Sequence, residues 1–443
     1  MKGESFEHRL RHMKKAALVF LCVILLMDSS VVLVSSSSQS QEGASVSSMD
    51  DSIIEMINQI DESLLREYHS GLLNFAPRYT GSINCNLAAE YLYSEFQDLG
   101  LQTEFYEWRY GGYHSKNIVA TLPGTDIWST VEYILCAHYD TFRTSPGADD
   151  DGSGTAALLA IASVLRNYQF NHTIRFIAFS GEEVGTYGSF TYARDASFRG
   201  DNIRAVLNMD MIGYANTEEG GKVLRFFPPK RSTWIADEAM VIAEKYNDLL
   251  DMKVVTLPGY RGADNQAFVD YGYDGVWIAH QDGYPWGHSP EDTADHLNWS
   301  YFVKTTRLML VITVEFAQKP IDVQVALQRP YEGYTYFFKR PVFESSFGKK
   351  YFGGLRGSTF IVGGKVQATA VVYSKEPIQY VVFCIDGYFM FWDSEPPYEW
   401  TIQGWFTPII GKHILDVYAY TTTGKVAFDQ MDISIFELAT TYK

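Results

Sequence analysis

Short apolar segments alternate with helical segments between residues 131 and 279, and this alternation restricts the fold more than any other feature. Residues 131–136 (VEYILC), 173–179 (TIRFIAF), 205–209 (AVLNM) and 275–279 (GVWIA) are rich in β-forming side chains. Residues 155–166 between them have a helical pattern that is apolar on every side. Strands that are apolar throughout are buried on both faces. The sequence therefore predicts an α/β domain with a mixed, mostly parallel sheet covered by helices on both faces.

The pattern changes after residue 319. Short alternating strands follow one another about every ten residues, with Asp-Gly and Thr-Gly turns between them, and this pattern predicts an all-β sandwich. We place an α/β domain at residues 51–320, and a linker and β-sandwich at 321–443. Packing in the sandwich core is favoured over exposure for Trp392, Trp400 and Trp405.

The N-terminal segment has the composition of an export signal. Basic residues precede a run of twelve apolar residues, 16–27, and small residues follow it. This order is typical of a secretory signal peptide, and twelve residues are few for a membrane span, which needs about 20. Residues 1–34 are therefore expected to be a signal peptide, or alternatively an uncleaved anchor, and 35–50 a Ser-rich spacer. We expect a secreted or cell-surface protein.

Charge and cysteine content exclude some classes of protein. The chain carries 36 basic and 53 acidic residues, a net charge of −17, which argues against nucleic acid as a partner. Outside the export signal, three cysteines lie far apart (Cys85, Cys136, Cys384) and make no disulfide framework. The sequons at Asn171 and Asn298 permit glycosylation if the protein is exported.

Metal-binding residue types follow the predicted strands at the points where each strand ends. They are His138, the pair Glu182 and Glu183, Asp210, and His288 in the loop after the last strand. Ligands bind beyond the carboxyl ends of strands in such sheets, so four distant segments bring these side chains to one edge. With Asp150, two histidines and three carboxylates suit a pair of divalent metals that share one carboxylate. The neighbouring free Glu suits a general base.

Two of the acidic positions allow alternatives. Asp150 lies in the glycine-containing loop PGADDDGSG, and one of the three aspartates in that loop could instead cap the buried helix. Asp140 lies two residues after His138 and can hydrogen-bond the far ring nitrogen of that histidine, which fixes its tautomer. The alternative is that Asp140 is an acidic residue of a surface loop.

The segments HYD, PGADDDGSG, FSGEEVGTYGS, NMDMIGY and GHSPEDT, in that order, resemble the co-catalytic zinc aminopeptidase family. Glutamate carboxypeptidases and glutaminyl cyclases are relatives of that family. With the upstream phrase PRYTGS, the resemblance covers about residues 53–315. The phrase VFCIDGYFMFWDSEPPYEWTI resembles immunoglobulin-like modules attached to secreted hydrolases.

The resemblance implies a role for each residue of the motifs. Asp150 would bridge two metals, with His138 and Asp210 on one of them and Glu183 and His288 on the other. Glu182 would be the general base, and Asp140 the partner of His138.

The segment GYRGADNQAF resembles a family stretch in which a tyrosine precedes an aspartate by four residues. Tyr260 would then stabilise the oxyanion, and Asp264 would be a structural partner near the site. The family often has Ser-Asp-His where this chain has Ala263-Asp264-Asn265. His280 competes with His288 as ligand; we favour His288, because HSPEDT matches the family phrase, and expect His280 to line the pocket.

We therefore expect an exported metallo-aminopeptidase with two zinc ions, or with cobalt or manganese, that acts on peptides with a free N-terminus. The alternatives are a carboxypeptidase or dipeptidase of the same family, for which Arg261 is the candidate carboxylate-binding residue, and a single-zinc glutaminyl cyclase. A non-catalytic receptor that has kept the fold is the alternative from another class. The β-sandwich could bind polymer, a cell surface or substrate, or cover the catalytic domain.

Overall fold

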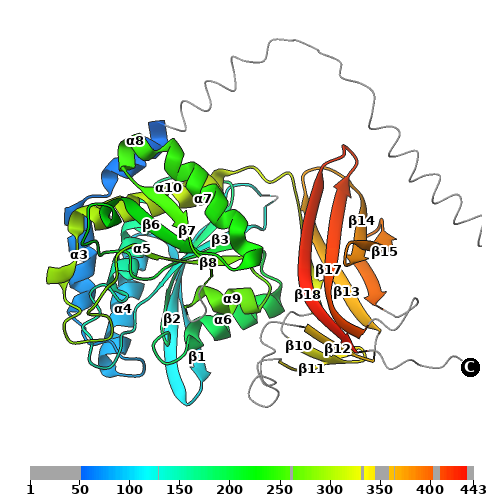
Figure 1. The fold of residues 1–443 in the computed structure, drawn as a ribbon, viewed down its shortest axis with the longest axis horizontal. Coiled ribbons are helices and arrows are strands. Elements are labelled where there is room, and N and C mark those ends of the chain that lie inside the picture. Colours follow the sequence, from blue (N-terminus) through cyan, green and yellow to red (C-terminus); the bar gives the residue numbers. More distant parts are fainter. Residues whose placement is uncertain are drawn as a thin grey trace, which may run out of the picture. The chain divides into compact units, whose positions relative to one another are not determined.

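The structure is a computed structural model, and it describes residues 51–127, 129–259, 263–330, 334–344, 359–363, 365–402 and 410–436 (Figure 1). The predicted signal peptide or anchor and the spacer, together with Tyr260, Arg261 and Trp405, lie outside the described residues. None of the helices in the described part of the chain has the length and apolar character needed to cross a membrane.

The α/β domain is built on a mixed sheet that has eight strands among the described residues, in the order β1-β2-β4-β3-β5-β8-β6-β7. The strands are β1 (Gln102–Tyr110), β2 (Tyr113–Leu122), β3 (Glu132–His138), β4 (Thr173–Phe179), β5 (Ile203–Met209), β6 (Val223–Phe227), β7 (Lys253–Thr256) and β8 (Gly275–His280). The four central strands β4, β3, β5 and β8 pair in parallel, and β2 and β6 join them antiparallel on either side. The predicted mixed, mostly parallel sheet is confirmed.

Helices cover this sheet on both faces. They are α3 (Glu62–Leu73), α4 (Ile83–Asp98), α5 (Gly152–Leu165), α6 (Tyr187–Arg199), α7 (Thr233–Lys245), α8 (Asn247–Leu250), α9 (Asn265–Asp270) and α10 (Trp299–Gln318). Successive residues of β3 face two separate hydrophobic cores. Leu135 packs in the cluster of α3, α4, α5, α7 and α10. Cys136, on the other face, packs in the cluster that contains α6 and α9.

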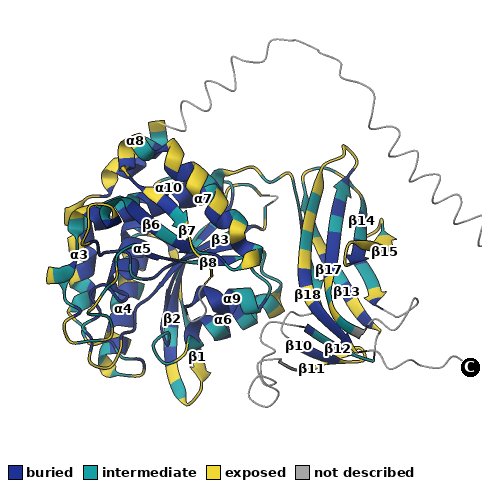
Figure 2. Ribbon diagram, viewed as in Figure 1, coloured by how far each residue is buried: buried dark blue, intermediate teal, exposed yellow. Residues whose placement is uncertain are grey.

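Helix α5 is the most enclosed element of the domain. All but one of its residues are buried, as the pattern without a polar face predicted, and Figure 2 shows it beside the buried central strands. It begins three residues earlier than predicted because Asp151 caps it. Gly154 in its first turn leaves no room for a Cβ, which would meet the carbonyl oxygen of Met209 at the end of β5. The start of the helix is therefore held directly against the carboxyl edge of the sheet.

The N-terminal helical region is divided into separate helices. Residues 51–59 are helical, and α3 begins after Asp61, whose side chain accepts a hydrogen bond from the Leu64 backbone N–H. An aspartate in this position is a preferred helix N-cap, so the capping residue, and not the apolar spacing, decides where the helix starts.

The C-terminal residues form an all-β sandwich, as predicted. One sheet has the order β11-β10-β12-β18-β17-β14-β15 and the other β16-β13-β9. The strands are β9 (Val323–Arg329), β10 (Tyr334–Phe337), β11 (Arg340–Glu344), β12 (Thr359–Val362), β13 (Val366–Ser374), β14 (Ile378–Ile385), β15 (Tyr388–Asp393), β16 (Tyr398–Ile402), β17 (Ile410–Thr421) and β18 (Val426–Phe436). The segment expected to be a linker after residue 320 thus contains three strands.

The tryptophans of the sandwich do not share one environment. Trp400 packs against the core residue Phe383, with ring centroids 6.2 Å apart. Trp392 is 54% exposed, and it pairs across the strands with Val382, which in turn pairs with Tyr418. The core placement expected for the tryptophans is therefore correct for Trp400 and wrong for Trp392.

The three cysteines are buried, and the two sequon asparagines form side-chain hydrogen bonds. Cys85, Cys136 and Cys384 are buried free thiols. Asn171 donates a side-chain N–H to the Gln318 carbonyl at 2.6 Å. Asn298 caps α10 and donates to the Ala215 carbonyl at 3.1 Å. Both asparagine side chains that would carry the predicted glycans therefore donate hydrogen bonds to backbone carbonyl groups.

Candidate metal centre and active site

The five predicted ligands meet at the carboxyl edge of the central strands. His138 is the last residue of β3, and Asp210 directly follows β5. Glu183 lies in the loop after β4, His288 in the loop after β8, and Asp150 precedes the cap of α5. Four are buried or half-buried, whereas the side chain of His288 is 57% exposed. The site is thus an enclosed cluster with one histidine at its mouth.

The Asp150 carboxylate stands between two groups of ligands. Its Oδ1 lies 3.3 Å from His138 Nε2, and its Oδ2 lies 3.2 Å from His288 Nε2. His138 Nε2 is also 3.7 Å from Asp210 Oδ1, and His288 Nε2 is 3.1 Å from Glu183 Oε2. Each oxygen of Asp150 therefore faces a separate His and carboxylate pair, which is the arrangement expected of a bridging ligand.

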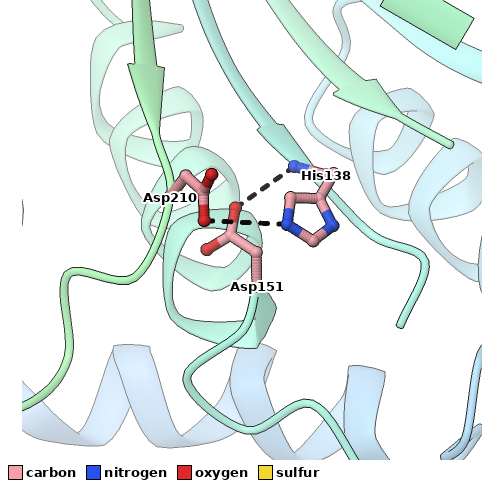
Figure 3. Close-up of side chains that lie close together, drawn as sticks. All are labelled: His138, Asp151 and Asp210. Atoms are coloured by element: carbon pink, nitrogen blue, oxygen red, sulfur yellow. Dashed lines mark hydrogen bonds and ion pairs between the residues drawn. The ribbon is translucent and has the colours of Figure 1, made fainter. Parts of the chain in front are cut away.

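Asp151 is the competitor for the first metal position, because its carboxylate also lies within reach of His138 and Asp210 (Figure 3). Its Oδ2 accepts the His138 backbone N–H at 3.2 Å. Its Oδ1 accepts the backbone N–H groups of Gly154 at 2.9 Å and Met211 at 3.2 Å. Both oxygens are engaged by the backbone, so Asp151 is the aspartate of the triplet that caps α5, and Asp150 is the one left available as a ligand.

Asp151→Ala is expected to lower the free energy of unfolding by about 3 kcal/mol or more, since a buried donor without an acceptor costs about 1–3 kcal/mol. Urea unfolding of the metal-loaded protein measures the loss. Asp61→Ala, at the exposed cap of α3, is the control and should cost about 1 kcal/mol. An equal effect of the two substitutions would contradict the role of Asp151.

The structure changes the role predicted for the Asp140 side chain. His138 Nδ1 lies 3.1 Å from the backbone carbonyl oxygen of Asp140 and 3.7 Å from its Oδ1. The carboxylate accepts hydrogen bonds from Thr80 Oγ1 at 2.5 Å and from the backbone N–H groups of Glu182 and Glu183 at 3.2 and 3.3 Å. The carbonyl of Asp140 thus orients the ligand His138, and its carboxylate holds the loop that carries Glu182 and Glu183.

The electrostatics of the cluster favour a bound cation. Burial raises the pKa values of Glu182, Glu183 and Asp210, and neighbouring carboxylates add to the effect. Hydrogen bonds that the His288 ring donates to the carboxylates of Asp150 and Glu183 raise its pKa to about 10. Crowded, buried carboxylates of this kind are stabilised in the charged form by a divalent ion.

The donor set fits two such ions. Each half offers one imidazole and one carboxylate besides the shared Asp150, and mixed nitrogen and oxygen ligands suit zinc. Glu183 Oε1 is buried without a hydrogen-bond partner among the described residues. An unpaired buried carboxylate oxygen at this place is what a metal ligand requires before its ion is bound.

His280 does not join either group of ligands. Its Nε2 lies 3.0 Å from Asp149 Oδ2 in a buried pair, and its ring packs edge-on against Tyr214. The prediction that His288 and not His280 is the ligand agrees with this geometry. Asp264 is fully buried, and burial raises its pKa to about 7. Tyr260, the predicted oxyanion stabiliser, lies outside the described residues.

Three residues at the site were not singled out from the sequence. Arg78 and Asp292 are fully buried and hold the loop before α5, although both lie in phrases that carry the family resemblance. Phe142 stacks on the ring of His288, with centroids 5.0 Å apart and planes 18° apart. In the sequence, Arg78 and Asp292 stand out only as charged residues among glycines and prolines. Nothing in the sequence indicates the role of Phe142.

His69 also supports this loop, because its Nε2 lies 2.8 Å from the Ala148 carbonyl oxygen. Burial lowers its pKa from 6.5 to about 4. The unfolded chain therefore takes up a proton first as the pH falls. The stability contributed by the neutral ring is complete above pH 6.5 and is lost as the pH falls toward 4.

His69→Gln keeps an N–H donor for the Ala148 carbonyl and removes the titrating ring. Between pH 6.5 and 4 the free energy of unfolding should fall less steeply in this variant, by about 1 kcal/mol per pH unit. Urea unfolding of both metal-free proteins at several pH values tests the expectation. Parallel pH profiles for the two proteins would show that His69 is protonated in the folded state as readily as in the unfolded chain.

Comparison with known proteins agrees with this geometry. Residues 117–313 match the model of Peptidase family M28. The chain is 30% identical over 220 residues to "Aminopeptidase YwaD" of Bacillus subtilis, a match that covers 46% of this chain and 45% of that protein. It is 28% identical over 289 residues to a "Probable leucine aminopeptidase" of Trichophyton verrucosum, covering 61% and 76%.

The fold is shared with a solved structure as well. That of BSAP, "a zinc aminopeptidase from Bacillus subtilis", superimposes with a TM-score of 0.54 at 17% identity and covers 59% of this chain and 96% of that one. The family match, residues 117–313, lies within the α/β domain and contains all five predicted ligands. Residues 117–313 are therefore similar to peptidase family M28.

Proposed function

We propose that the chain is an exported aminopeptidase that binds two divalent metal ions, most simply zinc, and hydrolyses peptides from a free N-terminus. The observation that carries the proposal is the placement of Asp150, whose two oxygens face separate histidines at 3.3 and 3.2 Å. A single carboxylate in that position serves two ions at once. Cobalt and manganese accept the same ligand types.

Two metal ions at this site would lower the pKa of a shared water molecule and make it a nucleophile near neutral pH. Glu182 is the residue that takes the proton of the attacking water and passes it to the leaving amine. Burial raises its pKa well above the usual range of a glutamate, which moves the carboxylate closer in basicity to the groups it exchanges protons with. Asp140 holds the Glu182 backbone in place for this transfer.

The charge around the site favours a substrate with a free amino group. Buried or half-buried carboxylates gather there: Asp140, Asp149, Asp150, Asp151, Glu182, Glu183, Asp210 and Asp292. They outnumber the positive charges of two bound dications. The buried cation beside them, Arg78, donates to the carbonyl oxygens of Tyr139, Pro146 and Gly147. An α-ammonium group is therefore attracted, and a substrate carboxylate is repelled.

The roles of the N-terminal segment, of Tyr260 and of the β-sandwich are proposed from sequence patterns. Residues 1–34 would direct export, as a signal peptide or as an anchor. Tyr260 would stabilise the oxyanion, following the family resemblance. The β-sandwich would be an immunoglobulin-like module that contacts a cell surface or a polymer, and its exposed Trp392 supports a surface role.

A panel of matched peptides with free, acetylated or glutamine N-termini tests the function, with products identified by mass spectrometry. The proposal predicts that single residues are released one at a time from free N-termini only. Release from the C-terminus would indicate a carboxypeptidase, and loss of ammonia from the glutamine peptide without hydrolysis would indicate a cyclase. No reaction of the zinc-loaded chain with any peptide would favour a non-catalytic protein.

A further inference from the structure

The Asp292 side chain lies directly behind the loop that carries the bridging carboxylate. It is fully buried and belongs to the turn that follows the ligand His288 by four residues. Its Oδ1 accepts the Asp149 backbone N–H at 2.9 Å, and its Oδ2 accepts the Asp150 backbone N–H at 3.2 Å. Its own carbonyl oxygen accepts the Ala148 N–H at 3.2 Å. One residue thus binds three successive N–H groups, the last of them that of the bridging ligand.

The opposite side of the same loop is held by cationic and imidazole donors. Arg78 donates to the carbonyl oxygens of Pro146 and Gly147, each at 3.0 Å. His69 Nε2 lies 2.8 Å from the carbonyl oxygen of Ala148. The backbone of residues 146–150 is therefore bound on its N–H side by Asp292 and on its carbonyl side by Arg78 and His69. The position of the bridging carboxylate follows from these contacts.

Only a carboxylate fits the place of Asp292. Besides the two backbone N–H groups, its oxygens accept the Tyr284 hydroxyl at 2.5 Å and the Ser145 hydroxyl at 3.4 Å. All four of these partners are donors, and a carboxylate is the side chain that accepts on both atoms. An asparagine would turn an NH₂ group toward at least one of these donors and leave it unpaired.

We propose that Asp292 is a positioning residue that fixes the backbone of Asp149 and Asp150 and thereby sets the affinity of the bridging carboxylate for metal. Its hydrogen bonds to this part of the site go to the backbone of the loop, so it acts through the loop. Carboxylates behind metal ligands typically change metal affinity by about 10–100-fold when they are replaced. This proposal rests on the proposed two-metal function.

The test compares Asp292→Asn with Asp274→Asn as a matched control. Asp274 is also a carboxylate that accepts only from donors, namely Arg231 Nε, the Ser232 hydroxyl and Trp234 Nε1. It precedes β8 at the amino end of the sheet, opposite the site. For both variants of the full chain, zinc dissociation constants are measured by competition with a chromophoric chelator, and thermal midpoints are measured with and without zinc.

We expect zinc binding to Asp292→Asn to be at least about tenfold weaker, and zinc binding to Asp274→Asn to match wild type. Tyr284→Phe removes one donor from Asp292 without touching the loop, and should weaken zinc binding by about three- to tenfold. This variant keeps the test decisive if Asp292→Asn does not fold.

Zinc affinity of Asp292→Asn equal to that of the control, at comparable loss of thermal stability, would overturn the proposal and leave Asp292 a purely structural residue. An unchanged affinity of Tyr284→Phe would overturn it as well. A wild-type chain that binds two zinc ions while the variants bind them equally well refutes only the positioning role. A wild-type chain that binds fewer than two refutes the proposed function itself.

Discussion

Replacing Glu182 by glutamine is expected to lower kcat by about 10²–10⁴-fold while both metal ions stay bound. Glutamine keeps the size and the polar character of the side chain but cannot accept a proton from the attacking water. The Glu182 backbone N–H bonds to Asp140 regardless of the side chain, so the loop should keep its conformation. The rate on an aminoacyl-nitroanilide and the zinc content of the same sample are the two measurements.

Glu90→Gln is a suitable control for that substitution, because Glu90 is an exposed residue of α4 whose carboxylate pairs with Lys116 on the surface. It should leave kcat unchanged. A Glu182→Gln protein that hydrolyses the substrate at the wild-type rate would remove Glu182 from the mechanism. A variant that loses zinc along with activity would make Glu182 a metal ligand instead of a base.

Asp150→Asn is expected to weaken the binding of both ions, by about 10²-fold or more, and to abolish activity at ordinary zinc concentrations. The two oxygens of Asp150 face His138 and His288. An amide supplies one oxygen without charge, so one half of the site loses a ligand and both halves lose the shared negative charge. Isothermal titration with zinc measures the change for each ion.

The exposed Asp248 of α8 provides the control, since Asp248→Asn makes the same chemical change away from the site. Its zinc binding should match wild type. If Asp150→Asn lost one ion and bound the other with unchanged affinity, Asp150 would be a ligand of a single metal and not a bridge.

The central strands could be predicted from the sequence because a strand that is buried on both faces appears there as a continuous apolar run. The segment 173–179 is β4 without any change of boundary, and the boundaries of the segments 131–136, 205–209 and 275–279 differ from those of β3, β5 and β8 by at most two residues at either end. The site followed from the same reasoning, since polar residues at the ends of parallel strands converge on one edge.

The outer strands on both sides of the sheet, β1, β2, β6 and β7, were not predicted. In β1 most residues are exposed or half-buried, and charged residues interrupt its apolar ones, so it lacks the continuous apolar run of a central strand. Strands β6 and β7 are short, with five and four residues, and therefore offer little periodicity to detect.

The contacts that support the ligands could not be predicted either. Asp140 orients His138 through its backbone carbonyl, and a backbone group has no signature in a sequence. Asp292 binds the N–H groups of residues that precede it by more than 140 positions. Such roles depend on the conformation of a loop, which side-chain types alone do not determine.

The most direct test of the two-metal account is to titrate the metal-free chain with zinc and to follow bound ions by native mass spectrometry and hydrolysis of an aminoacyl-nitroanilide in the same samples. The account predicts a mass increase of two zinc ions per chain and no further binding at the site. It also predicts that hydrolysis reaches its maximum once the second ion is bound. Full activity with a single bound zinc, or a chain that binds no more than one ion, would contradict it.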